Sequence, residues 1–212
     1  MPKLSRRPSV PQFNTYQSYK QYLREDFQYC CIYCAIHENE YGGPRGFTVE
    51  HFRPKSIFTD LTNDYKNLLY GCNICNPFKG NDWPSDDPLF DGVGYLDPCE
   101  HDYDAHFRLK GFEIEGLTQP ALYMIERLHL NRRQLVKLRQ KRWDEEAVHV
   151  KTLQEFHEQI ELIDTAIHSQ QLSPAIQEQF HTLKQTIANQ LHVMIEKWER
   201  RWEPLYTLED YR

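Results

Sequence analysis

Two short cysteine pairs, Cys31-Ile-Tyr-Cys34 and Cys72-Asn-Ile-Cys75, decide how the middle of this chain folds. The Cys-x-x-Cys spacing is that of a zinc knuckle, and two knuckles supply the four thiolates of a tetrahedral Zn²⁺ site. Four cysteines leave no coordination position open for a substrate, so the sequence predicts a structural zinc. The alternative is four unrelated buried thiols. Cys30 and Cys99 are left over, and Cys30 could compete with Cys31 for the metal.

The segment between the knuckles is longer than in simple zinc ribbons, and it is rich in residues that can do chemistry. It contains Glu50-His51-Phe-Arg-Pro-Lys and Asn67-Leu-Leu, and the second knuckle continues as Asn76-Pro-Phe-Lys79-Gly-Asn. In this order and spacing, the motif resembles the HNH nucleases, which have a ββα-metal fold and often a four-cysteine zinc site. The resemblance covers about residues 30–82. More narrowly, the motif is similar to the HNH effectors of bacterial anti-phage systems of the Septu and retron-associated kind.

The resemblance implies a role for each motif residue. His51 matches the general base, because a neutral imidazole can take a proton from water near neutral pH. Asn67 matches the residue that orients this histidine. Glu50 and Asn76 match the ligands of a catalytic Mg²⁺ or Mn²⁺, and both offer the hard oxygen atoms that these ions prefer. Lys79 is expected to contact phosphate.

The motif departs from the family pattern at two positions. The first metal ligand is commonly Asp or His and here is Glu50, whereas the last is commonly His and here is Asn76. Asn73 and Asn81 are alternatives to Asn76. Because adjacent strand residues point to opposite faces, Glu50 and His51 can serve one site only if the strand ends or bulges between them.

The sequence predicts an α+β fold in three parts. Residues 1–29 form an N-terminal helical segment, with an amphipathic helix near 15–27. Residues 30–117 form the zinc-binding HNH nuclease domain, in which a ββα-metal core and a treble-clef-like zinc site are followed by a loop-rich extension with a hairpin at 107–114. Residues 118–212 form a helical C-terminal domain.

Two long helices are predicted in this last part. Asn131 can cap the first, whose apolar residues recur every three or four positions from Val150 to Ile167. Ser173-Pro174 is typical of a second helix start, and the same spacing continues from Ile176 to Trp198. Matching apolar seams predict an antiparallel helical hairpin. This hairpin either closes over the small domain or serves as an interaction arm.

Charge is unevenly distributed along the chain. The whole sequence carries a formal charge of −6, which by itself disfavours a nucleic-acid partner. The window 127–142, however, contains seven basic residues and no acid. A stripe of one sign within an acidic protein favours phosphate contact. The residues expected to bind DNA, or alternatively RNA, are Lys79, Arg132, Arg133, Lys137, Arg139 and Lys141.

These observations predict a metal-dependent HNH endonuclease that hydrolyses phosphodiester bonds in DNA, as an effector of anti-phage defence. The alternatives are a noncatalytic zinc-knuckle module that binds nucleic acid, and an RNA or tRNA nuclease on the same fold. The family resemblance implies an ATPase partner in a defence complex. No apolar run approaches the ~20 residues of a membrane span, and the N-terminus lacks the apolar core of a signal peptide, so we expect a cytoplasmic protein.

Overall fold

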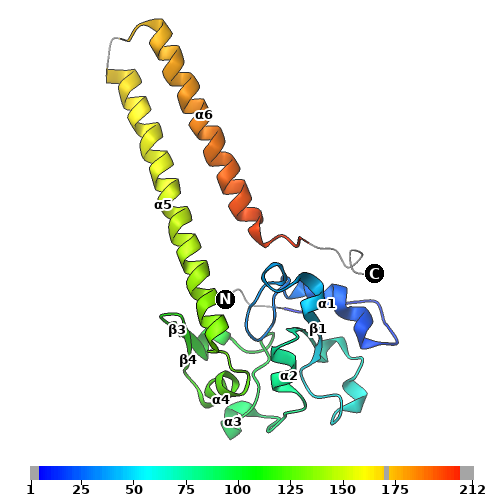
Figure 1. The fold of residues 1–212 in the computed structure, drawn as a ribbon. Helices are drawn as coiled ribbons and strands as arrows, with labels where there is room; N and C mark the ends of the chain where they lie inside the picture. The colour runs from blue at the N-terminus through cyan, green and yellow to red at the C-terminus, as the bar shows by residue number, and fades with distance from the viewer. Residues whose placement is uncertain (1–4, 170–171, 206–212) are drawn as a thin grey trace. The chain divides into compact units, whose positions relative to one another are not determined.

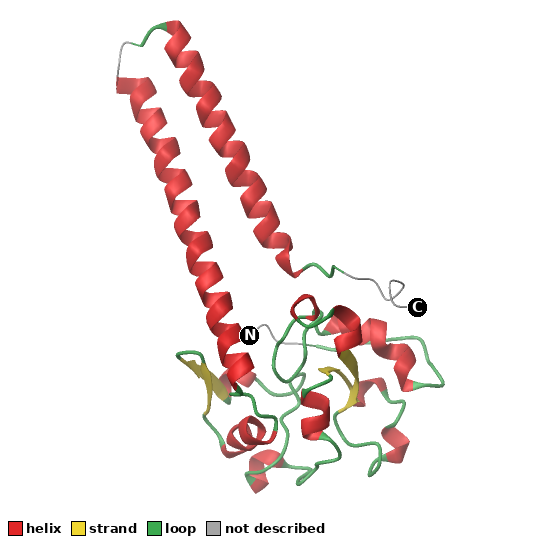
Figure 2. Ribbon diagram, in the orientation of Figure 1, coloured by secondary structure: helices red, strands yellow, loops and turns green. Residues whose placement is uncertain are grey.

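A computed structural model describes residues 5–169 and 172–205 (Figure 1). These residues fall into two compact units. The knuckle unit comprises the described residues up to 138 together with 204 and 205, and the hairpin unit comprises 139–203. Within the described residues, strands are confined to two small hairpins, and most of the remaining regular structure is helical (Figure 2). The mixed α and β class predicted from the sequence is confirmed.

The elements alternate between short 3₁₀ turns, strands and helices. The strands are β1 (Phe47–His51), β2 (Leu68–Cys72), β3 (Phe107–Lys110) and β4 (Glu113–Gly116). The α-helices are α1 (Lys20–Asp26), α2 (Cys75–Lys79), α3 (Pro88–Asp91), α4 (Gln119–Arg127), α5 (Arg133–Ser169) and α6 (Pro174–Glu199). The 3₁₀ turns are η1 (Tyr16–Tyr19), η2 (Glu38–Glu40), η3 (Gly43–Gly46), η4 (Thr59–Leu61), η5 (Tyr65–Asn67), η6 (Tyr103–Ala105) and η7 (Arg200–Trp202).

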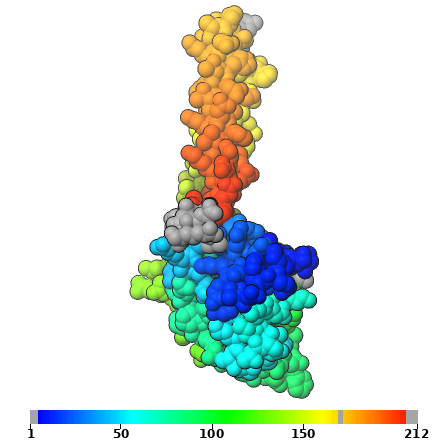
Figure 3. All heavy atoms as spheres, turned by 90° about the vertical axis from the view of Figure 1, so that its right-hand side faces the viewer, coloured from blue at the N-terminus to red at the C-terminus, as the bar shows by residue number. Residues whose placement is uncertain are grey.

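The N-terminal helix forms as its apolar spacing predicts. Tyr19, Leu23 and Phe27 recur every four residues, and all three are buried against the first sheet. The helix ends where Gln28 and Tyr29 adopt positive φ angles of 51° and 60°. In the space-filling view, the N-terminal segment (dark blue) lies directly against the segment around residues 50–70 (cyan) (Figure 3).

The first hairpin carries the motif predicted from the sequence. β1 and β2 pair antiparallel, with Glu50 opposite Leu69 and His51 opposite Leu68. All five residues of β2 are buried. The rings of Phe47 and Tyr70 stack at 4.9 Å and fix the start of the hairpin. Helix α2 follows β2 after a two-residue turn, so the order β1–β2–α2 gives the expected ββα arrangement.

The second hairpin, β3–β4, confirms the prediction for 107–114. Helix α4 packs on β4, and a Cβ atom at Gly116 would lie 2.8 Å from the Leu122 backbone nitrogen, so only glycine fits there. The Asn131 side chain accepts from the Ile114 N–H and donates to the Ile114 carbonyl, both at 2.7 Å. Helix α5 begins at Arg133, two residues after the cap predicted at Asn131.

The predicted borders at 29/30 and 117/118 fall inside the knuckle unit. Both α1 and α4 contribute to the core that surrounds the first sheet, through residues such as Leu23 and Met124. Helix α5 starts in this unit and continues into the hairpin unit at residue 139.

The hairpin unit consists of α5 and α6, the two long helices expected from the sequence. Helix α5 has 37 residues, about 55 Å at ~1.5 Å per residue. Ile163, Ile187 and Leu191 are the buried apolar residues among those described in this unit. Fewer of the predicted interface residues are buried than their spacing suggests. Val150, Ile176 and Leu183 are all more than 40% exposed. No helix within the described residues is long and apolar enough to cross a membrane.

Candidate functional site

The four knuckle cysteines form one buried cluster. Their sulfur atoms all lie within 4.8 Å of one another, and the Cys34 and Cys72 sulfurs are 3.9 Å apart. A tetrahedral zinc with bonds of ~2.3 Å separates its sulfur ligands by ~3.8 Å, so the cluster fits this metal. Cys31 and Cys34 lie in the turn before η2, Cys72 ends β2 and Cys75 begins α2. The cluster therefore joins the N-terminal part of the chain to the ββα core.

The sulfur atoms also accept hydrogen bonds. The Cys72 N–H donates to the Cys31 sulfur at 3.3 Å, and the Cys75 N–H donates to the Cys72 sulfur at 3.4 Å. Such donors stabilise the thiolate that a metal requires. Cys30 pairs with His37 in an isolated antiparallel β-bridge of the backbone, and it is not one of the four clustered cysteines.

Arg132 is directed at this cluster. Both terminal nitrogens of its guanidinium lie 3.6 Å from the Cys75 sulfur, and Nη1 also donates to the Leu128 and His129 carbonyls. Arg132 was expected to bind nucleic acid. The structure places its charge against a cysteine of the cluster, where it would support a metal-bound thiolate.

Glu50 is a buried carboxylate on the face of β1 that is turned toward α2. Its Oε1 lies 3.1 Å from Lys79 Nζ and accepts a hydrogen bond from the Tyr33 hydroxyl at 3.4 Å. Burial raises the pKa of Glu50, and the nearby Lys79 charge opposes this shift. The carboxylate is thus held in place by two partners from different elements.

Asn76 lies on the same face as Glu50, across Gly71 of β2. A Cβ atom built at Gly71 would lie 3.3 Å from the Glu50 Cβ and 3.9 Å from the Asn76 Cβ. Glycine therefore lets an acid and an amide, two side chains whose oxygens suit Mg²⁺ or Mn²⁺, lie close to the β2 backbone. Of the two alternatives, Asn73 donates to the Arg45 carbonyl at 2.9 Å, and Asn81 is exposed beyond α2. This arrangement favours Asn76.

The His51 ring occupies the opposite face of the strand end. Its Nε2 lies 3.0 Å from the Thr62 carbonyl, and the Tyr16 ring packs edge-on at 4.6 Å. A carbonyl only accepts, so Nε2 carries the proton and Nδ1 keeps its lone pair. Burial lowers the pKa of His51, which favours the neutral ring. Among the described residues, the ring makes its contacts with Tyr16 and Thr62 rather than with Glu50 or Asn76, as strand alternation requires.

Asn67 fastens the chain that follows His51. Its Oδ1 accepts from the Arg53 N–H at 2.8 Å, and its Nδ2 donates to the carbonyls of Arg53 and Leu61 at 3.0 and 3.3 Å. The Asn67 carbonyl accepts from the Phe52 N–H at 2.9 Å. The side chain is buried, so these bonds are shielded from water. Asn67 therefore holds the backbone immediately after His51.

The structure corrects the expectation that Lys79 contacts phosphate. The side chain has no exposed surface, and Nζ is held by Glu50 and by the His51 carbonyl at 3.0 Å. The Tyr95 ring lies 5.3 Å from Nζ. Burial lowers the pKa of Lys79, and Glu50 opposes this shift. Lys79 links the residues of the strand end from inside the protein.

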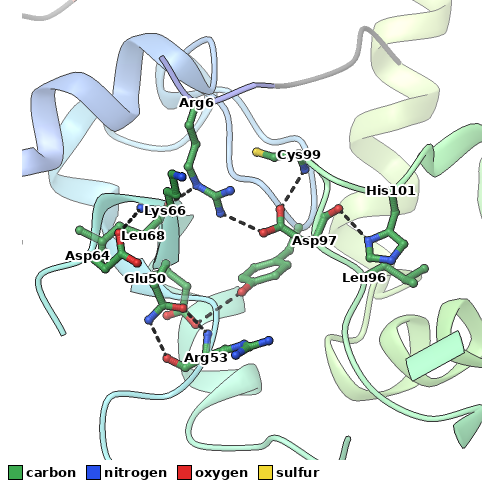
Figure 4. Close-up of polar contacts among 12 residues, drawn as sticks. Arg6, Glu50, Arg53, Asp64, Lys66, Leu68, Leu96, Asp97, Cys99 and His101 are labelled. Atoms are coloured by element: carbon green, nitrogen blue, oxygen red, sulfur yellow. Dashed lines mark hydrogen bonds and ion pairs between the residues drawn. The ribbon is translucent and has the colours of Figure 1, made fainter. Parts of the chain in front are cut away.

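The sequence pattern gave no sign of Tyr33, which sits inside the first knuckle, or of Arg6. Arg6 Nε donates to the Leu68 carbonyl at 3.0 Å, and its Nη2 lies 3.2 Å from Asp97 (Figure 4). Leu68 is the register partner of His51. Arg6 thus ties the N-terminal segment to the end of the hairpin that carries the motif.

The remaining basic residues of the predicted stripe lie along α5. Arg133, Lys137 and Lys141 are exposed, and Arg139 is half-buried. Lys141 lies 3.5 Å from Glu145 one helical turn later. The first part of α5 therefore presents several cations to solvent.

Comparison with known proteins agrees with this geometry. Residues 31–82 match the model of the HNH endonuclease family, so the segment with both knuckles and the ββα core is an HNH domain, as the resemblance predicted. The chain is also 31% identical over 101 residues to the Septu protein PtuB of Bacillus thuringiensis. This alignment covers 48% of the chain and 36% of PtuB, and thus about a third of that relative. No solved structure matches the chain.

Proposed function

We propose that the chain is a metal-dependent HNH endonuclease that hydrolyses phosphodiester bonds in DNA. The observation that carries the proposal is the pairing of Glu50 with Asn76 around Gly71, at the strand end that also bears His51. These groups lie inside the segment that matches the HNH family. Because the His51 ring lies on the opposite face from Glu50 and Asn76, the proposal requires the phosphodiester to reach around the strand end, with the cation on one side and the attacking water on the other.

Each residue has a defined task in this reaction. His51 takes a proton from the attacking water through Nδ1, while Nε2 stays bound to the Thr62 carbonyl. Asn67 keeps the backbone after His51 in place, so that the ring does not swing away. Glu50 and Asn76 would hold the divalent cation, which supplies charge stabilisation for the phosphate and the leaving oxygen.

Four cations of α5, three of them exposed and Arg139 half-buried, are proposed to bind the nucleic-acid backbone. Arg133, Lys137, Arg139 and Lys141 follow one another along the helix. Each phosphate contact releases counterions, so binding through this stripe should weaken as salt is raised.

We also propose a role as a nuclease effector in anti-phage defence, working with a partner protein that the family resemblance suggests is an ATPase. The similarity to a Septu protein supports the role. Large apolar side chains left exposed on the hairpin unit support a partner, among them Trp143 and Leu162 at 65% and 70% exposure. Purification from the native host should recover a complex; a chain that is alone and fully active there contradicts the partner.

The central test is His51→Ala, assayed on supercoiled plasmid with Mg²⁺ or Mn²⁺. Cleavage should be lost while zinc content and circular dichroism stay those of the wild type. His157→Ala, an exposed histidine of the hairpin unit, is the matched control and should cut normally. Equal cleavage by His51→Ala and wild type would remove the proposed base.

A second pair of variants tests the metal ligand. Asn76→Ala should lose cleavage, whereas Asn73→Ala in the same turn region should keep it, because Asn73 is bound to the Arg45 backbone.

Total RNA in a parallel assay separates an RNA nuclease from a DNA nuclease. Intact plasmid together with a shifted gel band would indicate binding without cleavage.

A further inference from the structure

The carboxylate proposed to bind the catalytic cation already has a buried positive partner. Lys79 Nζ lies 3.1 Å from Glu50 Oε1, and neither side chain is more than 5% exposed. The next acid, Asp82, is compensated in turn by Arg127 at 3.2 Å and by the Tyr95 hydroxyl at 2.8 Å. The two side chains that flank Gly71 therefore offer a cation one neutralised carboxylate and one uncharged amide.

Lys79 is not a surface side chain that can swing aside. Its Nζ is shared between Glu50 and the His51 carbonyl, and the side chain has no exposed surface through which to leave. The ammonium therefore stays close when another cation approaches Glu50. A divalent ion bound there alone would add two positive charges beside a buried one, and buried charges interact strongly because the interior screens them poorly.

We infer that Lys79 makes cation binding at Glu50 and Asn76 conditional on nucleic acid, so that the divalent ion and a phosphodiester bind together. The phosphate supplies negative charge to the cation, because Lys79 already neutralises the charge of Glu50. Free enzyme then holds the catalytic cation weakly, and the site is completed by its substrate. This inference rests on the proposed function, since it assigns the metal to Glu50 and Asn76.

The test measures Mn²⁺ binding to the zinc-loaded full-length chain. Binding is detected by electron paramagnetic resonance, because the signal of free Mn²⁺ decreases as the ion binds. All proteins carry His51→Ala, so that a short DNA duplex stays intact. Only the Mn²⁺ binding that Asn76→Ala abolishes is assigned to the proposed site. This control excludes Mn²⁺ that is bound to the DNA alone. The duplex should tighten Mn²⁺ binding at least ~10-fold, as expected for one compensating charge at close range.

Lys79→Gln removes the charge and keeps a hydrogen-bond donor for Glu50 and the His51 carbonyl. It should tighten Mn²⁺ binding without DNA by ~10-fold and shrink the gain that DNA brings. Lys66→Gln, an exposed lysine between the same knuckles, is the matched control and should behave like its parent. Lys79→Arg keeps the charge and should keep the dependence on DNA.

Two results would overturn the inference alone: Mn²⁺ affinity that is equal with and without DNA, or Lys79→Gln that binds free Mn²⁺ no better than its parent. If Lys79→Gln loses zinc or its fold, the inference is tested with Lys79→Arg instead. This variant keeps the positive charge, so Mn²⁺ binding that no longer depends on DNA would contradict the inference. If no Mn²⁺ binding depends on Asn76 even with DNA, the proposed function itself fails, and the inference falls with it.

Discussion

The two units of this chain are held together in different ways. The knuckle unit has a continuous buried core, a four-cysteine cluster and a fully buried ion pair between Arg24 and Glu38. The hairpin unit has three buried apolar residues among those described, and the charged side chains of its ion pairs are partly or fully exposed. A unit with a continuous core and buried polar pairs depends on single residues, whereas a long helix pair depends on many weak contacts.

Loss of the zinc that the four-cysteine cluster is predicted to bind should have the largest effect, and only on the knuckle unit. Cys34→Ser leaves three ligands, and the binding free energy of a structural zinc, ~10–16 kcal/mol, is comparable to the whole stability of a domain. We expect loss of zinc by elemental analysis and loss of the near-ultraviolet circular dichroism of the buried tyrosines. Cys30→Ser, one residue before the cluster, should keep both; a zinc-free Cys34→Ser protein with a native spectrum would contradict the role of the cluster.

The second prediction concerns the buried ion pair. Arg24 Nε lies 3.0 Å from one Glu38 oxygen, which also accepts from the Tyr70 hydroxyl at 2.9 Å. Arg24→Met leaves Glu38 charged and buried without its main partner, so urea unfolding should show a loss of ~3–5 kcal/mol. Arg108→Met breaks the exposed pair with Glu115 and should cost far less, because water screens the attraction between exposed charges. Equal costs for the two variants would mean that burial does not distinguish the pairs.

The sequence predicted the parts of the molecule that depend on local spacing. Two Cys-x-x-Cys pairs predict a zinc cluster because each knuckle sets the geometry of its own two sulfurs. The seam positions from Val150 to Trp198 predict two helices because the helical period is local as well. The role of Asn76 as a metal ligand stays a prediction, because it comes from the family resemblance and not from local spacing.

The sequence could not predict contacts made by long side chains across the fold. Arg132 reaches Cys75, 57 residues away in the sequence, and a basic run cannot show that one member turns inward. Lys79 stands in a motif that suggests phosphate contact, yet the packing of α2 against the first hairpin buries it. The apolar spacing in the hairpin unit likewise predicts which face of each helix is apolar, but not how closely the two helices approach. The exposure of Leu183 therefore could not be predicted.

The third prediction measures how much the hairpin unit depends on its few buried residues. Ile163 is 7% exposed and the preceding Leu162 is 70% exposed on the same helix. Ile163→Ala should cost ~2 kcal/mol, at the low end for buried residues because the neighbours can relax. Leu162→Ala should change stability by less than ~0.5 kcal/mol. If Leu162→Ala is the costlier variant, as thermal unfolding would reveal, the face assigned to the core is wrong.

The smallest effect is expected for the ion pair that links α5 and α6. Lys184 Nζ lies 2.6 Å from both oxygens of Asp164, but both side chains are more than a third exposed, and water screens the attraction. A double-mutant cycle with Lys184→Met and Asp164→Asn should give a coupling of ~0.5 kcal/mol that shrinks in 1 M salt, because the Debye length falls to ~3 Å. The neighbouring pair Lys151–Glu155, within one helix, should give a similar or smaller value. A coupling above ~2 kcal/mol that salt leaves unchanged would show that Lys184 and Asp164 behave as a buried pair, and that the hairpin unit is stabilised in the same way as the knuckle unit.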